Sequence, residues 1–315
     1  METVEAGRDT WRPYEITSDT AGTPDLVGWL DELGPDKLTD LLTERMALVF
    51  RDFRVSPEAI EPVLDRLVPS RLPYVHGNSP RTKVRGNLYT STEYPQQYTI
   101  SMHNELSYAH RWPARLAFYC EKAAEQGGAT PVLDGELWLS SLDAEVREAF
   151  SGGIRYVQNL HDGYGFGKSW QDTFETGDRA AVEEFLKDSQ AEWEWGPDGL
   201  RVIQLRAATV RHPVTGTEVW FNQADQWHPA GLGDQTSADL YEILSPEEFP
   251  QYVTFADGTA IPDAYVEQIL NRGLECAVDV DWRTGDVLLI DNVLVAHGRR
   301  PFEGTRRVLV AMSHG

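Results

Sequence analysis

Cysteine is scarce in this sequence, which has only Cys120 and Cys276 among its 315 residues. Two isolated cysteines form neither a disulfide framework nor a CxxC metal site, and they are typical of a protein in a reducing compartment. The N-terminal stretch METVEAGRDTWRPYE lacks the basic and apolar segments of a secretory signal peptide. We therefore expect a cytoplasmic protein.

Basic residues are also few: 28 lysines and arginines stand against 50 aspartates and glutamates, for a formal net charge of −22. Binding to nucleic acid depends on clustered lysine and arginine, so the composition argues against a nucleic-acid partner. The longest apolar stretch, residues 287–296, is too short for a membrane span and is interrupted by Asp291. Internal repeats, low-complexity tracts and interdomain linkers are missing too, which favours one domain over residues 1–315.

What the sequence does contain is material for a large β-rich core, with 41% hydrophobic residues and ten tryptophans. Helical spacing of leucines in 25–53 and a further helical pattern in 57–67 predict a helical N-terminal part, residues 1–70. From residue 71 onward, short apolar runs alternate with turn residues and predict strands. We expect a mainly β chain with helical decoration, in which a polar, aromatic insertion at about 161–200 forms a lid.

The stretch SMHNELSY, residues 101–108, places His103 and Glu105 two positions apart in a run that resembles a strand. Side chains alternate along a strand, so these two would share one face, about 6–7 Å apart. If that face is buried, the imidazole and the carboxylate need a polar partner. A metal ion is one such partner.

A second histidine lies almost two hundred residues further along, where His297 closes the apolar segment GDVLLIDNVLVAH, expected to be one buried strand. Two histidines and one carboxylate on one face of an iron ion leave three positions open for substrates. Nine residues after His297 comes Arg306 in GTRRVLVAM. A buried arginine there would need an anion, and a dicarboxylate would satisfy it.

The ordered set HNELSY, GGATP and GDVLLIDNVLVAHGRRPFEGTRRVLVAM resembles the non-haem Fe(II), 2-oxoglutarate-dependent oxygenases of the taurine dioxygenase (TauD/TfdA-like) superfamily. The similarity is greatest to the branch of clavaminate-synthase-like and nonribosomal-peptide-tailoring enzymes. It implies a double-stranded β-helix (jelly-roll) core with iron held by His103, Glu105 and His297. It also implies that O₂ and 2-oxoglutarate are cosubstrates.

The same resemblance assigns 2-oxoglutarate binding to Thr130 and to an arginine at the start of the last strand. Arg306 and Arg307 are adjacent, and strand alternation lets only one of them face inward, so both stay candidates. Related halogenases replace the metal-binding carboxylate with a small residue to admit chloride. The presence of Glu105 therefore disfavours halogenation.

The activity implied is hydroxylation of an unactivated C–H bond in a small amino-acid-like substrate, within secondary metabolism such as antibiotic biosynthesis. The substrate would be free or presented by a carrier protein, and desaturation or cyclisation would need only a different pose. The expected substrate contacts are Arg85, Asn87, Asn222 and Trp227. A non-catalytic jelly-roll protein that binds a small ligand is the rival of another class. A zinc hydrolase is disfavoured because the chain has no HExxH motif.

Overall fold

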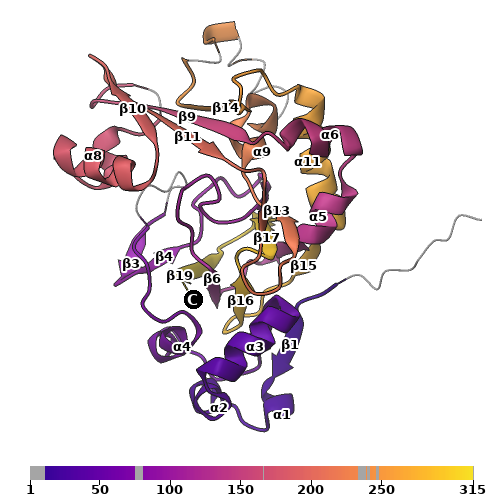
Figure 1. The fold of residues 1–315 in the computed structure, drawn as a ribbon. Coiled ribbons are helices and arrows are strands. Elements are labelled where there is room, and N and C mark those ends of the chain that lie inside the picture. The colour runs from indigo at the N-terminus through magenta and orange to yellow at the C-terminus, as the bar shows by residue number, and fades with distance from the viewer. Residues whose placement is uncertain are drawn as a thin grey trace, which may run out of the picture.

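The computed structural model describes residues 11–74, 81–165, 167–232, 239, 242–245 and 248–314. Two β-sheets pack against each other at its centre, and helices cover the outer face of each sheet (Figure 1). The expectation of a mainly β chain with helices is confirmed, and two packed sheets are what a jelly-roll core requires. No helix in the described ranges has the length and apolarity needed to cross a lipid bilayer.

The larger central sheet has seven strands, and all its pairs except β1–β2 are antiparallel. In spatial order these are β1 (Tyr14–Thr17), β2 (Ala47–Arg51), β16 (Val287–Asp291), β6 (Arg115–Lys122), β19 (Arg307–Ser313), β4 (Leu88–Thr90) and β3 (Lys83–Arg85). Its outer face is covered by the N-terminal helices α2 (Leu26–Leu33), α3 (Pro35–Arg45) and α4 (Ile60–Leu67), which follow the short α1 (Ser18–Ala21).

The N-terminal part, predicted to be helical, also contains the two strands β1 and β2. The leucines of α2 and α3 recur four residues apart, as in Leu26 and Leu30, and they do pack on the sheet. Residues 47–51, ALVFR, instead form β2, and all five are buried. A short, continuously apolar run fits a buried strand as well as a buried helix, so periodicity could not separate the two.

The smaller central sheet carries the functional residues described below. Its strands are β15 (Val278–Val280), β8 (Thr130–Asp134), β17 (Val295–Arg299) and β5 (Ile100–His103), all paired antiparallel. Side chains from both sheets meet in one core, for example Phe118 of β6 and Val132 of β8. The outer face packs on α5 (Gly135–Ser141), α6 (Ala144–Phe150) and α11 (Asp263–Cys276), with Trp138 fully buried between them.

The segment GDVLLIDNVLVAH was expected to be one strand, and the structure shows two. β16 ends at Asp291 in the seven-stranded sheet, and β17 begins at Val295 in the four-stranded sheet. The carboxylate of Asp291 accepts the backbone N–H groups of Val293 and Leu294 at 2.9 and 3.1 Å. This local side-chain bonding closes a turn inside an apolar run, and it moves the chain from one sheet to the other.

The insertion at 161–200 belongs to a third sheet with a hydrophobic core of its own, including Trp170 and Leu186. That sheet contains β10 (Glu192–Trp195), β11 (Gly199–Arg206), β9 (Ile154–His161) and β14 (Gln251–Phe255), and it is accompanied by α7 (Trp170–Phe174) and α8 (Arg179–Asp188). In Figure 1 it lies at the end of the molecule opposite the N-terminal helices. The remaining short elements are β7 (Gln126–Gly127), β12 (Thr209–Arg211), β13 (Glu218–Trp220), α9 (Ala224–Trp227), a 3₁₀ helix (Pro229–Leu232) and β18 (Phe302–Glu303).

Gly298 allows β17 and β5 to approach each other closely beside His297. A Cβ atom at this position would lie 2.5 Å from the carbonyl oxygen of Ile100. Gly298→Ala is therefore expected to force the two strands apart and to destabilise the fold by about 1–3 kcal/mol. Thermal and urea unfolding measure this effect. Gly152→Ala is the control, because a Cβ there meets nothing within 4 Å, and equal stability of the two variants would contradict the prediction.

Candidate metal centre and adjoining cavities

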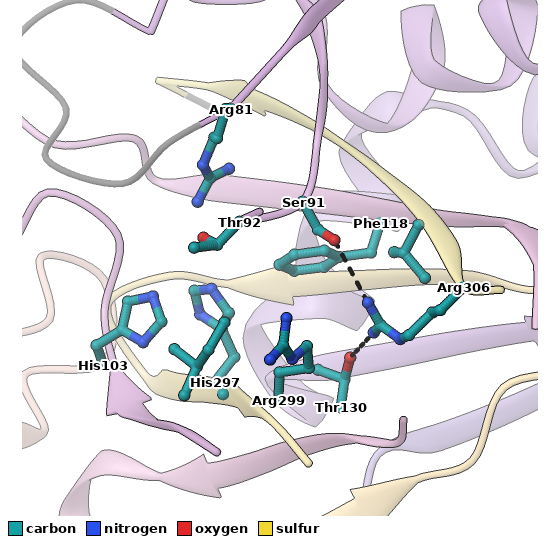
Figure 2. Close-up of a pocket in the computed structure, with 12 residues that line it drawn as sticks. Arg81, Ser91, Thr92, His103, Phe118, Thr130, His297, Arg299 and Arg306 are labelled. Carbon is teal, nitrogen blue, oxygen red and sulfur yellow. Dashed lines mark hydrogen bonds between the residues drawn. The ribbon is translucent and has the colours of Figure 1, made fainter. Parts of the chain in front are cut away.

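His103, Glu105 and His297 come together between the sheets, and all three side chains are buried. The antiparallel pairing of β17 with β5 places His297 directly opposite His103, with ring centroids 4.4 Å apart (Figure 2). Nε2 of His297 lies 4.0 Å from Oε2 of Glu105. One candidate ligand atom from each residue falls within 4.8 Å of the others, which is close enough to hold a single metal ion.

The route by which Glu105 reaches this point differs from the expectation of one continuous strand. β5 ends at His103, and the chain then turns, with Leu106 at a φ of 57°. The side chain of Asn292 holds this turn from the β16–β17 connection. Its Oδ1 accepts the N–H of Glu105 at 2.8 Å, and its Nδ2 donates to the carbonyl of Glu105 at 3.1 Å. Strand alternation therefore does not bring the carboxylate beside His103; a turn fixed by a distant asparagine does.

The protonation of the two imidazoles suits a metal site. Nδ1 of His103 donates to the carbonyl of Ser101 at 2.9 Å, which leaves Nε2 as the free nitrogen. Burial lowers the pKa of His103, although the negative charge of Glu105 opposes the shift. Burial also lowers the pKa of His297 well below its ordinary value, helped by the nearby His103 and Arg81. Two neutral imidazoles beside a carboxylate side chain fit a divalent iron ion with open positions.

Arg81 is a buried partner of this centre that the sequence did not reveal. Its Nη2 donates to Oε2 of Glu105 at 2.5 Å, and both side chains are almost fully enclosed. The guanidinium also lies over the ring of Tyr74, 4.6 Å from the centroid. Although burial acts against it, the charge of Glu105 raises the pKa of Arg81 above its ordinary value. The guanidinium therefore stays positively charged beside the candidate metal position.

A narrow cavity runs from the two imidazoles toward Arg306, which approaches from the start of β19 (Figure 2). Nε of Arg306 donates to the carbonyl of Gly128 at 2.9 Å, and its terminal nitrogens lie 3.4 Å from the hydroxyls of Ser91 and Thr130. Burial, together with the nearby charge of Arg299, lowers the pKa of Arg306 to about 10, so it stays cationic at neutral pH. Thr130 and Arg306 thus lie together at the end of the cavity away from the imidazoles.

Arg307 does not share this location. It is exposed and forms an ion pair with Glu121 on the neighbouring strand β6. Arg306, the residue just before β19, therefore points inward, whereas Arg307, the first residue of the strand, points outward. The inward arginine lies at the cavity and the outward one at the surface.

A second, larger cavity of about 420 Å³ adjoins the narrow one. It shares Thr92 and Ile100 with the narrow cavity, and Glu105 lines it. Trp227 is in its wall, together with Gln223 and Gln226 from the same segment. None of the described residues of the 161–200 insertion lines either cavity; Gly167 and Lys168 instead line an adjoining cavity of about 290 Å³ that shares Trp227.

The structure does not bring the other three expected substrate residues to this cavity. Arg85 forms an ion pair with Glu61 at the surface, and Asn87 donates to the carbonyl of Arg71 at 2.6 Å. Asn222 is fully buried, where its side chain donates to a backbone carbonyl at 2.8 Å and accepts the N–H of Ala224, the first residue of α9, at 3.1 Å. Arg85 and Asn87 were predicted to contact the substrate because they precede the metal-binding strand in the sequence. This prediction is wrong, because β3 and β4, the strands at these residues, lie at one end of the larger sheet.

A sandwich of two β-sheets with two histidines and one carboxylate between them is the architecture of a metal-dependent oxygenase. The model of the taurine catabolism dioxygenase TauD, TfdA family matches residues 14–312. The chain therefore belongs to this dioxygenase family.

Two known proteins are similar in sequence over most of their length. The dapdiamide synthesis protein DdaC of Enterobacter agglomerans is 37% identical over 278 residues, which cover 87% of this chain and 84% of that protein. A clavaminate synthase-like protein of Arabidopsis thaliana is 32% identical over 292 residues, which cover 87% and 83%. The chain thus aligns with most of the length of both proteins.

Solved structures share the fold at much lower identity. PvcB of Pseudomonas aeruginosa superposes with a TM-score of 0.52 at 14% identity, over 89% of this chain and 80% of that chain. A taurine dioxygenase of Burkholderia xenovorans superposes with a TM-score of 0.50 at 16% identity, over 92% and 82%. The arrangement of sheets and helices is therefore common to enzymes whose sequences have diverged widely.

Proposed function

We propose that the protein is an Fe(II)- and 2-oxoglutarate-dependent dioxygenase that hydroxylates an unactivated C–H bond of a small amino-acid-like molecule, free or tethered to a carrier. The observation that carries this proposal is the buried set of His103, Glu105 and His297, whose side chains line a cationic cavity and a larger cavity of mainly aromatic and amide side chains. Family membership supports it independently.

In this proposal His103, Glu105 and His297 hold the iron, and 2-oxoglutarate lies in the narrow cavity. Bound together, iron and 2-oxoglutarate activate O₂ for oxidation of a C–H bond. Arg306 and Thr130 hold the carboxylate of the cosubstrate that lies away from the metal, since a cation and a hydroxyl converge there. The free space is only about 30 Å³, so entry requires lining side chains to shift. The two 3.4 Å hydrogen bonds of Arg306, to the hydroxyls of Ser91 and Thr130, are long and therefore weak, so a bound carboxylate could replace them.

In this proposal the larger cavity binds the substrate. Its volume is within the range of small-molecule sites, and its walls combine aromatic rings with neutral amide groups. Trp227, Gln223 and Gln226 come from the segment FNQADQWH and would orient the substrate over the metal. The name of the dapdiamide synthesis protein supports a biosynthetic substrate. Desaturation and cyclisation would use the same residues and differ only in how the substrate lies.

The proposal is tested by adding Fe(II) and 2-oxoglutarate to the protein without oxygen. A weak visible charge-transfer band is expected, because His103, Glu105 and His297 would hold the metal and leave positions at which 2-oxoglutarate could bind. Succinate release is then screened in air over free amino acids, small peptides and carrier-bound aminoacyl groups. If no band develops and no succinate forms, the proposal is contradicted. That result would favour the non-catalytic alternative, a jelly-roll protein that only binds a small ligand.

A further inference from the structure

Arg81 has more hydrogen-bonding capacity than its surroundings use. Only 2% of its side chain is exposed, and its guanidinium points toward the two imidazoles and Thr92 (Figure 2). Nη2 donates to Glu105, whereas Nε and Nη1 are buried without a hydrogen-bond partner among the described residues. Leaving charged donors unpaired in a buried site is unfavourable, so such groups in a native protein usually await a ligand or an ion.

The other two arginines of the narrow cavity are better satisfied. Arg299 donates to three backbone carbonyls at 2.7–2.9 Å, and Arg306 contacts one carbonyl and two hydroxyls. In the described part of the chain, three guanidinium groups and no carboxylate side chain line this cavity. The cavity is therefore built for an anion, and Arg81 is the arginine with two nitrogens still to be paired.

Arg81 also lies where the two cavities meet. It lines the narrow cavity itself, while its two contacts, Glu105 and Tyr74, line the larger one. The carboxylate oxygen that it binds, Oε2 of Glu105, is the one that lies 4.0 Å from His297. Arg81 and a metal ion would therefore draw on the same oxygen, and an incoming carboxylate would give Arg81 a second partner.

We propose that Arg81 binds a ligand carboxylate beside the metal position, at the junction of the two cavities. This inference rests on the proposed function. The carboxylate comes from one of two sources, the metal-side carboxylate of 2-oxoglutarate or a carboxylate of the substrate in the larger cavity. Either ligand would form charge-assisted hydrogen bonds with the unpaired nitrogens.

The test compares the wild type with Arg81→Met, Arg81→Lys and the control Arg85→Met, which removes an exposed arginine that lines neither cavity. Mn(II) affinity is measured first by electron paramagnetic resonance. It should be equal or higher in Arg81→Met, because the competitor for Oε2 is gone. Calorimetry then gives the dissociation constant of 2-oxoglutarate with each Mn(II)-loaded protein. N-acetylglycine and its neutral amide, N-acetylglycinamide, are titrated last, with 2-oxoglutarate saturating and oxygen excluded.

If the cosubstrate is the ligand, Arg81→Met weakens 2-oxoglutarate binding at least tenfold, and Arg81→Lys has a smaller effect because it keeps the charge. If the substrate is the ligand, 2-oxoglutarate binding is unchanged, and the preference of the wild type for N-acetylglycine over the amide disappears in Arg81→Met. The inference is overturned if 2-oxoglutarate binding is unchanged and the wild type shows no preference for the acid. A wild type that binds neither Mn(II) nor 2-oxoglutarate would contradict the proposed function itself.

Discussion

His297→Ala is expected to abolish succinate formation and to weaken Mn(II) binding by on the order of 100-fold or more. Loss of an outer hydrogen-bond partner of a metal ligand already costs roughly 10–100-fold in affinity, and loss of a ligand itself should exceed that. The substitution removes one nitrogen from a set of three ligand atoms that lie within 4.8 Å of one another. Calorimetry with Mn(II) measures the loss of metal binding. A succinate assay, with a substrate found in the screen described above, measures the loss of activity.

The choice of His297 over Glu105 for this experiment follows from the ion pair with Arg81. Removing Glu105 would leave Arg81 buried and unpaired, and breaking a buried pair from one side typically costs about 3–5 kcal/mol of stability. Lost activity in Glu105→Ala could then reflect unfolding. His110→Ala is the matched control, since this histidine lines neither cavity. Wild-type metal affinity in His297→Ala would show that the metal is held elsewhere.

Arg306→Met is expected to raise the KM for 2-oxoglutarate by roughly 100-fold, whereas Arg307→Met should leave it within about threefold. Arg306 is inside the narrow cavity with Thr130, while Arg307 is at the surface in an ion pair with Glu121. Hydrogen bonds to charged groups contribute about 1.5–3 kcal/mol, and each 1.4 kcal/mol is a factor of ten.

The two variants differ by one position and remove the same charge, so each controls for the other. Steady-state succinate formation over a range of 2-oxoglutarate concentrations gives KM and kcat for both. Arg306 makes one hydrogen bond of ordinary length, to the carbonyl of Gly128, and two long ones, so thermal unfolding should show that Arg306→Met is not severely destabilised. A larger effect on KM from Arg307→Met than from Arg306→Met would overturn the assignment.

Much of the fold could be predicted from the sequence, because apolar periodicity and turn residues indicate local secondary structure. The helices α2, α3 and α4 lie within the segments 25–53 and 57–67, where the pattern predicted helices, and strands such as β6 and β8 follow in the region predicted to be β-rich. β2 was missed because its four consecutive apolar residues, 47–50, are too few to show a period. The turn at Asp291 was not predicted, because two adjacent polar residues within a long apolar segment are also compatible with one continuous strand.

The residues of the candidate site that belong to ordered motifs could be predicted from the sequence. Those that reach the site only through three-dimensional packing could not. His103, Glu105 and His297 could be singled out together, but the turn that delivers Glu105 could not, since alternation assumes a continuous strand. Arg81 stands in the stretch SPRT, which has no apolar period and no metal-binding spacing. Its role emerges only when the fold places it against Glu105, about 24 residues later in the chain.

The hydrogen bonds of Asn292 to the backbone of Glu105 have a consequence for how the protein acquires its metal. Because they join the two distant halves of the centre through the polypeptide itself, the ligands are held in place before any ion arrives. Apoprotein prepared with a chelator is therefore expected to remain folded and to be reconstituted within mixing time. Substituted forms loaded with cobalt or manganese should adopt the same backbone, which makes them suitable surrogates for crystallography in air.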